Sequence, residues 1–255
     1  MYQRNGIGLA LVLLALFAGS NQPANADLIT LQPTADTALF SGNPNNNLGG
    51  HTNFAAGTMA NGSLSRALIQ FNSAASIPTN SIIHSVTLTL AVTAAASATP
   101  SSFELHPLLT GWGEGNKTGQ TGAPASTGEA TWNARFAPGT LWGTPGGQSG
   151  IDFAAASSGS TSIGGVGSFT FGSTSGLVAD VQNWLNNPGS DFGWLLLNAN
   201  ESDANTARRF ASREDGLGRG PLLSIDFSPV PEPSTLGLFG LGAMGLLWFR
   251  QRKTV

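Results

Sequence analysis

The segment 82–92 restricts the fold of this chain more than any other. Apolar residues alternate there with small or polar ones, as Val86, Leu88, Leu90 and Val92 against Ser85, Thr87, Thr89 and Ala91. Successive side chains of a strand point to opposite faces of a sheet. This period of two therefore predicts a β-strand with one buried face.

Most of the remaining pattern also predicts short strands separated by turn residues. The expected strands are 28–31, 37–40, 66–71, 103–108, 168–171, 192–197, 209–213 and 222–227. Stretches rich in Gly and Ser at 111–128 and 145–167 predict long loops. One helix is expected at 176–185, where apolar residues recur at helical spacing. Together these elements predict an all-β fold, an antiparallel β-sandwich of jelly-roll type with one short helix.

The C-terminal residues form three parts in a fixed order. Pro231, Glu232 and Pro233 precede an apolar run at 236–249, and a basic end follows at 250–253. This order resembles the PEP-CTERM sorting tail of exported proteins in Gram-negative bacteria. The resemblance implies a C-terminal transmembrane helix, transient anchoring in the inner membrane and removal by an exosortase-type membrane protease. The alternative is an ordinary membrane anchor, although 14 residues are fewer than the roughly 20 of a usual span.

The N-terminus has the features of a secretory signal peptide. Arg4 supplies a positive start, residues 7–18 are the apolar core of an expected signal helix, and Ala24-Asn25-Ala26 fits the small-x-small rule for cleavage. We expect cleavage after Ala26. The chain then divides into a signal peptide at 1–26, a β-sandwich domain at 27–229 and a sorting or anchor segment at 230–255.

The amino-acid composition restricts the classes of molecule that this protein is expected to bind. The chain has no cysteine, so the exported domain must be held by its own core, which a domain of this size can bury. Between positions 27 and 230 there are 13 acidic and 7 basic residues, so nucleic acid is not expected as a partner. The surface should be rich in hydroxyls and amides, as in sugar-binding and matrix proteins.

Short segments in a fixed order resemble the DNRLRE (disaggregatase-related) domain. They lie at 33–37, in the Asn-rich loop at 42–47, and at 65–71, 76–78, 85–90, 109–115, 130–133, 192–194, 210–214 and 221–225. The expected helix lies between the segments 130–133 and 192–194. The resemblance implies a β-sandwich akin to carbohydrate-binding modules, which are often attached to polysaccharide-degrading enzymes. This chain departs from the pattern in one place, because 17 residues separate Glu114 from Trp132, where many relatives run almost directly from one to the other.

Aromatic rings beside polar groups are the first candidates for sugar binding, because flat rings stack on sugars and polar groups read hydroxyls. The candidates are Trp112, Trp132 and Trp142 with the neighbouring Glu114 and Asn133. The alternative is that these tryptophans cover the core. Trp184 and Trp194 follow apolar patterns and are expected inside the core.

Charged residues supply two further sets of candidates. Arg209 and Arg213 could bind uronate or sulfate groups, and the alternative is that they pair with nearby acidic residues. Asp36 and Asp226 are candidate oxygen ligands for a structural calcium ion. Catalytic signals are weak, because HExxH and GxSxG motifs are absent, although Glu114 with Glu129, or His106 with Glu104 and Arg135, could serve a hydrolase or lyase.

These observations lead to three hypotheses of function. The first is an exported, non-catalytic β-sandwich protein of the outer cell surface or exopolysaccharide matrix of a Gram-negative bacterium, which binds extracellular polysaccharide. The second is a structural surface or biofilm matrix protein without a specific small ligand. The third is a polysaccharide lyase or hydrolase.

Overall fold

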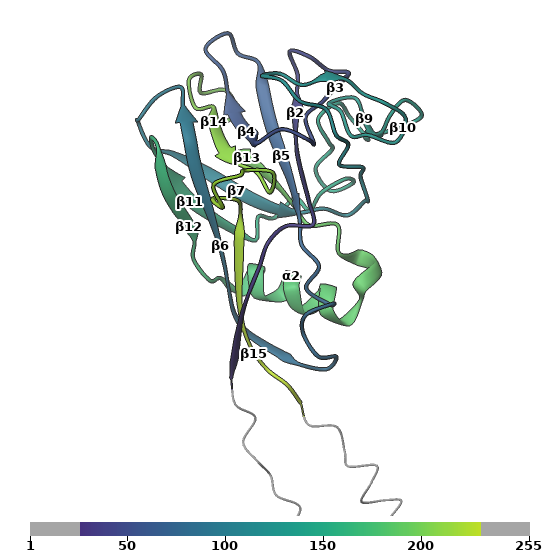
Figure 1. The fold of residues 1–255 in the computed structure, drawn as a ribbon, viewed down its shortest axis with the longest axis vertical. Coiled ribbons are helices and arrows are strands. Elements are labelled where there is room, and N and C mark those ends of the chain that lie inside the picture. Colours follow the sequence, from purple (N-terminus) through teal and green to yellow (C-terminus); the bar gives the residue numbers. More distant parts are fainter. Residues whose placement is uncertain (1–25, 231–255) are drawn as a thin grey trace, which may run out of the picture. The chain divides into compact units, whose positions relative to one another are not determined.

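The computed structural model describes residues 26–230, and Figure 1 shows their arrangement. The expected signal helix, the expected transmembrane helix and the triplet Pro231, Glu232, Pro233 lie outside these residues. Within residues 26–230, no helix combines the length and the apolar character that a membrane crossing requires. Ala26–Val230 forms one compact unit, and all the packing described below lies inside it.

Eleven strands form one curled sheet in which every paired strand is antiparallel to its neighbour. They are β1 (Asp27–Leu31), β2 (Ala35–Phe40), β4 (Asn53–Thr58), β5 (Leu64–Gln70), β6 (Ile82–Ala95), β7 (Ser101–Pro107), β11 (Gly159–Ile163), β12 (Gly167–Phe171), β13 (Trp194–Asn198), β14 (Arg208–Ala211) and β15 (Leu222–Ser228). The predicted all-β antiparallel fold is confirmed.

The sheet has two halves that hydrogen bonds join into one. The first half contains β1, β15, β6, β14 and β4, with β12 on the other edge of β6. The second half contains β2, β5, β13, β7 and β11. The hairpin between β4 and β5 connects the halves, because Gly57 pairs with Ser65 and Thr58 pairs with Leu64.

The main core is filled by apolar side chains from both halves of the sheet. The predicted alternation in β6 is confirmed, because Val86, Leu88 and Leu90 are completely buried while the residues between them are partly exposed. Residues of β14 and β15 join them from the first half, and residues of β5, β7 and β13 join from the second half. Burying one face of each half against the other is the main source of hydrophobic stabilisation.

The helix α2 (Ser175–Asn186) closes one end of this core, in the lower half of Figure 1. Its first turn is capped by the Thr174 side chain, which accepts a hydrogen bond from the backbone N–H of Leu177. Its buried residues are the predicted stripe of Leu177, Val181, Trp184 and Leu185. The ring centroids of Trp184 and Trp194 lie 4.5 Å apart, so both are core residues as expected.

A second core lies on the opposite face of the second half of the sheet. Strand β13 is buried on both faces, which explains its continuous apolar sequence. Trp194 and Leu196 face the main core, whereas Leu195 and Leu197 face the second core. The second core is covered by the long connection between β7 and β11, with the short strands β3 (Asn46–Asn47), β8 (Ala123–Pro124), β9 (Ala134–Phe136) and β10 (Thr140–Leu141).

Two strands of the eleven-stranded sheet were missing from the prediction. The expected loop at 145–167 contains β11, which has little apolar sequence and forms because it pairs with β7 along five residues. Strand β4 was also missed, because its short Asn-Phe-Ala-Ala-Gly-Thr sequence has no clear alternation. In both cases tertiary pairing, rather than local propensity, determines the structure.

The two ends of the described domain lie side by side at the lower end of Figure 1. Strand β1 pairs with β15 so that Asp27 lies opposite Phe227. The chain therefore enters and leaves the domain at the same end.

Candidate functional site

The three candidate tryptophans of the long connection pack into the second core. Trp112 and Trp132 are each 8% exposed and Trp142 is 5% exposed. The indole N–H of Trp112 donates to the carbonyl of Phe192 at 3.0 Å, and that of Trp142 donates to the carbonyl of Thr131 at 2.8 Å. These rings cover the sheet, which is the alternative that their sequence context left open.

The Trp132 ring is also covered on its outer side by Arg66 and Gly146. The guanidinium carbon of Arg66 lies 5.5 Å from the centre of the Trp132 ring. Arg66 is itself fixed by a bidentate pair with Glu201, at 2.6 and 2.7 Å. Gly146 packs so close that an added Cβ would lie 2.6 Å from the ring. A ligand would have to displace these groups to reach the ring.

Asn133 joins two loops rather than pointing into a hollow. Its side-chain amide donates to the Asn45 side chain at 2.9 Å, and its backbone N–H donates to the carbonyl of Pro44 at 3.2 Å. Asn133 therefore fastens the long connection to the Asn-rich loop at 43–47.

Glu114 and Arg213 are far apart in the sequence but lie in contact. Together with Asp36 and Glu214 they form a group of charges that we call the Arg213 cluster. Glu114 accepts from the Arg213 guanidinium at 2.6 and 2.8 Å and from the backbone N–H of Asp36 at 2.8 Å. Asp36 accepts from the backbone N–H of Arg213 at 2.7 Å. Glu214 lies 2.8 Å from the same guanidinium. The cluster joins β2, the long connection and the segment after β14.

Burial shifts the proton equilibria of the Arg213 cluster. Burial raises the pKa of Asp36 to about 8, and the negative charges of Glu214 and Glu114 act in the same direction. Burial also raises the pKa of Glu214. The hydrogen bonds that Arg213 donates to Glu114 raise the pKa of Arg213, which therefore stays charged. At neutral pH the buried Asp36 thus holds a proton, while Arg213 balances part of the remaining negative charge.

The structure separates the two candidate calcium ligands. Carboxylate oxygens of Asp36, Glu114 and Glu214 lie within 4.8 Å of one another, beside the Arg213 guanidinium. Asp226 is not in this group and lies in β15, opposite Leu28 of β1. Arg213 already supplies a positive charge where a cation would bind.

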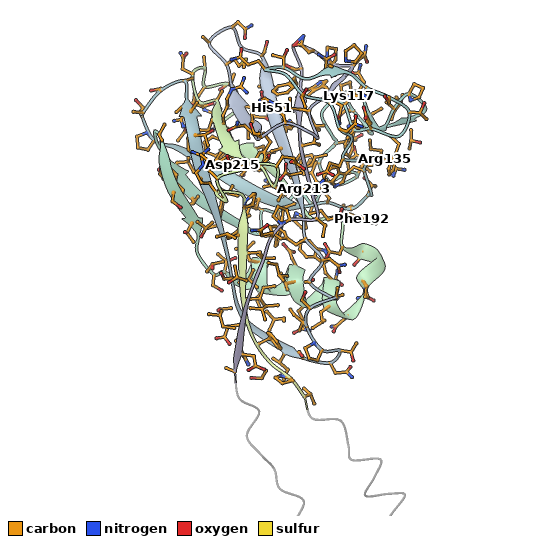
Figure 2. All side chains as sticks on the ribbon, viewed as in Figure 1. His51, Lys117, Arg135, Phe192, Arg213 and Asp215 are labelled. Atoms are coloured by element: carbon orange, nitrogen blue, oxygen red, sulfur yellow. The ribbon has the colours of Figure 1, made fainter. Side chains whose placement is uncertain are left out.

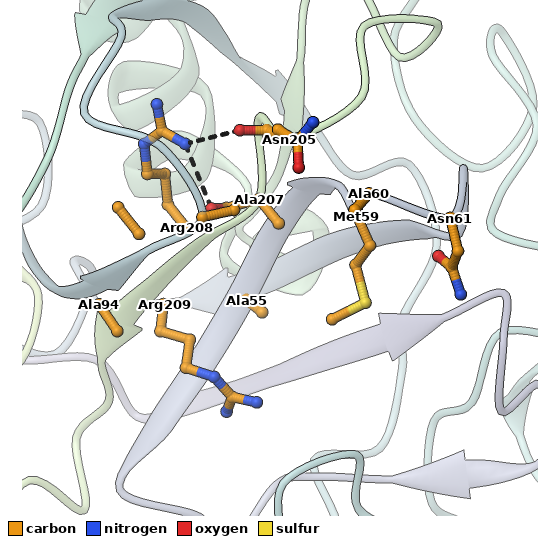
Figure 3. A pocket seen from close by; sticks show the side chains of 11 residues that line it. Ala55, Met59, Ala60, Asn61, Ala94, Asn205, Ala207, Arg208 and Arg209 are labelled. Carbon is orange, nitrogen blue, oxygen red and sulfur yellow. Dashed lines mark hydrogen bonds between the residues drawn. The ribbon is translucent and has the colours of Figure 1, made fainter.

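Arg209 lies beside an open hollow on the first half of the sheet, which we call the Arg209 hollow (Figure 3). Its volume is about 480 Å³ and its lining includes Ala55, Ala94, Met59 and Asn61. Arg209 pairs with Ala55 on one side and with Ala94 on the other, so these three side chains share a face of the sheet. The short alanine side chains leave room that larger residues would fill.

Arg208 contributes a buried positive charge beneath this hollow. It is 1% exposed, and burial lowers its pKa. Its guanidinium donates to backbone carbonyls, among them those of Thr206 at 2.9 Å and Thr99 at 2.7 Å. Figure 3 draws its bonds on the side away from Arg209. Carbonyl oxygens satisfy the donors without cancelling the charge, so the hollow lies above a positive region.

The Arg209 side chain itself remains partly exposed. One of its guanidinium nitrogens donates to the carbonyl of Gln120 at 2.9 Å, which directs the group along the rim of the hollow. Burial and the positive charge of Arg209 lower the pKa of His51. His51 is therefore neutral at neutral pH and adds no charge to the rim.

The residues considered for catalysis hold backbone groups or each other. Glu129 accepts from the backbone N–H groups of Ser126 and Asn116, at 2.7 and 3.3 Å. His106 lies 3.3 Å from Glu104 and bonds the carbonyl of Ala154 at 2.9 Å. Arg135 lies elsewhere, over the Phe136 ring. Glu114 and Glu129 are thus engaged in separate contacts.

The comparisons with known proteins identify the C-terminal part of the chain. Residues 229–253 match the PEP-CTERM protein-sorting motif. This motif indicates an exported protein that is sorted to the cell surface and processed by an exosortase in the membrane. No curated protein matches the chain.

Sequence reasoning found Arg209 but missed its surroundings. The alanines at 55, 94, 95 and 96 have no chemistry of their own, and they form a hollow only because β4, β14 and β6 lie side by side. The buried position of Arg208 was also missed. The alternation of side chains along a strand was the available signal, because it places Arg208 and Arg209 on opposite faces.

Proposed function

We propose that this protein is a non-catalytic surface domain that binds extracellular polysaccharide at the Arg209 hollow. The observation that supports the proposal is a hollow of about 480 Å³ with an alanine floor and a guanidinium at its rim. The amide of Asn61 adds a group that can donate to and accept from hydroxyls. Export and surface sorting would place the hollow where polysaccharide is available.

The proposal relies on hydrogen bonds and charge rather than on stacked tryptophans. Because Trp112, Trp132 and Trp142 are packed into the second core, they support the fold instead of offering a platform. An exposed arginine beside a shallow apolar floor can bind hydroxyl and carboxylate groups at modest cost. Affinities in the micromolar to millimolar range are expected for such a shallow site.

Affinity electrophoresis of residues 26–230 in gels that contain neutral or acidic polysaccharides tests this function. We expect saturable retardation on at least one polymer and less retardation for Arg209→Gln. The matched control is Arg135→Gln, which removes the same charge from the long connection. Figure 2 shows Arg135 well apart from His51, whose pKa Arg209 lowers. Absence of retardation on every polymer, with the domain folded, would refute polysaccharide binding.

We also propose the finer architecture and placement. The two facing halves of the curled sheet support a β-sandwich of jelly-roll type, as the resemblance to DNRLRE domains implies. The compact unit Ala26–Val230 supports a domain at 27–229 between a signal peptide and a sorting segment. The proposed location is the outer surface or extracellular matrix of a Gram-negative bacterium.

A structural matrix protein without a specific ligand is the second candidate. It is favoured by the long connection, whose tryptophans, Asn133 and charged side chains are engaged in internal contacts. This function predicts that deletion of the protein alters cell aggregation or biofilm cohesion, and that Arg209→Gln restores it as well as the unchanged protein. Failure of Arg209→Gln to restore cohesion would instead favour polysaccharide binding.

A further inference from the structure

A second hollow adjoins the Arg209 hollow on the same half of the sheet. Its volume is about 370 Å³, and its lining includes Thr89, Ala91, Thr93, Ser168, Val166 and Arg219. Thr93 of this second hollow and Ala94 of the Arg209 hollow are consecutive residues of β6. The two hollows therefore meet along one strand.

The strand pairing places both hollows on the outer face of the sheet. Leu88, Leu90 and Val92 point into the main core, so Thr89 and Ala91 point outward. The register shifts where β6 meets β14, because Arg209 faces Ala94 whereas the next residue, Phe210, faces Val92. Thr93 is the extra residue of this irregularity, and a bulge lets neighbouring side chains share one face.

Contacts of Thr93 connect the two hollows. Its hydroxyl donates to the carbonyl of Arg209 at 3.3 Å and also bonds the side chain of Asn53 on β4. Beside it, the hydroxyl groups of Thr89 and Thr170 are 2.9 Å apart across β6 and β12. The place where the two hollows meet is thus held by hydrogen bonds between strands, and its surface carries small residues with hydroxyl groups.

Each hollow has one exposed or partly exposed arginine. Arg209 borders the first, and Arg219 borders the second, with 46% of its side chain exposed. Arg219 also pairs with Asp215 at 2.8 Å, which fixes its position. The residues that line the two hollows include no Asp or Glu, although the domain as a whole is acidic. Arg208 and Arg209 therefore give the two hollows a net positive charge on a negative domain, whereas Asp215 offsets the charge of Arg219.

We propose that the two hollows form one groove for an extended chain of an acidic polysaccharide, whose carboxylate or sulfate groups bind Arg209 and Arg219. This inference rests on the proposed function and specifies its substrate class. The segment of β6 from Thr89 to Ala95 spans roughly 20 Å at about 3.4 Å per residue. A chain of several sugars reaches both arginines, whereas a short oligosaccharide occupies only one hollow.

Binding of polygalacturonate, dextran sulfate and uncharged dextran to residues 26–230 tests the inference, with a galacturonate disaccharide and octasaccharide as short and long probes. We expect the acidic polymers to bind and the octasaccharide to bind much more tightly than the disaccharide. Arg209→Gln and Arg219→Gln should each weaken octasaccharide binding about tenfold, as loss of a charge-assisted hydrogen bond does. The acidic polymer that binds more tightly identifies the anionic group.

Arg135→Gln is the control for general attraction of a polyanion, and the melting temperature of each variant confirms that it is folded. If Arg219→Gln leaves octasaccharide binding unchanged while Arg209→Gln weakens it, the second hollow takes no part, and only the proposed function stands. The inference is overturned if Arg135→Gln weakens octasaccharide binding as much as Arg209→Gln and Arg219→Gln do. It is also overturned if uncharged dextran binds as tightly as the acidic polymers. If none of the polymers binds, the proposed function itself fails.

Discussion

Replacement of Trp132 by alanine should strongly destabilise the domain, although this residue lies in a connection rather than in a regular strand. Trp132 is 8% exposed and packs between Arg66 and Gly146 in the second core. A buried tryptophan removes about 200 Å² from water, which corresponds to about 5 kcal/mol at 25 cal/mol per Å². Alanine retains a small part of this, so we expect a loss of about 3–5 kcal/mol.

Urea denaturation of residues 26–230, followed by tryptophan fluorescence and circular dichroism, measures this loss. Leu141→Ala is the matched control in the same connection, because Leu141 is 62% exposed and its removal should change the free energy of unfolding by less than about 0.5 kcal/mol. The m-value should stay constant. For a domain of about 200 residues, the melting temperature of Trp132→Ala should fall by roughly 6–20 °C.

A loss below about 1 kcal/mol, at an unchanged m-value, would refute the argument that Trp132 is a core residue. Polysaccharide binding gives an independent check. At a temperature where Trp132→Ala is still folded, a gel that contains a polymer bound by the domain should retard this variant as much as it retards the unchanged domain. A variant that remains stable and loses binding would show that the ring contacts the ligand.

Two further predictions concern the Arg213 cluster. Burial raises the pKa of Asp36 from 3.8 to about 8, so its contribution to stability is complete below pH 3.8 and is lost as the pH rises to about 8. The free energy of unfolding should therefore fall between about pH 5 and about pH 8, and urea titrations should show a smaller fall for Asp36→Asn. An unchanged fall would contradict the raised pKa of Asp36. Glu114→Ala should cost about 1–3 kcal/mol, because the Asp36 N–H loses its acceptor and the Arg213 guanidinium loses one of its two carboxylate partners. The exposed Asp203→Ala is its control and should be nearly neutral in the same titrations; equal losses would contradict a specific role of Glu114.

Those parts of the fold in which side-chain periodicity matches burial could be predicted from sequence. The alternation in β6 and the apolar stripe of α2 each reflect one buried face, so they identify their elements directly. Strand β11 lacks such a pattern because its stability comes from pairing with β7. A single sequence does not show which segment will supply that partner.

The candidate site was harder to predict for a related reason. Trp112, Trp132 and Trp142 occur in Gly-rich sequence that is typical of exposed loops, yet the loop folds back over the sheet and buries them. The second core was not anticipated, because the continuous apolar sequence of β13 indicates burial but does not show which segment covers its second face. Arg213, by contrast, has acidic neighbours in the sequence, and its pairing with Glu214 was an expected alternative.

The pairing of β1 with β15 also determines how the domain resists mechanical load. Strand β15 ends at Ser228, two residues before Val230, so tension applied at Val230 acts along this strand. The hydrogen bonds from β15 to β1 and β6 run across the direction of pull and bear the load together. Extraction of β15 requires shearing both ladders at once rather than opening them one bond at a time. A domain held at its C-terminal end is thereby protected against being unravelled by traction from the matrix around it.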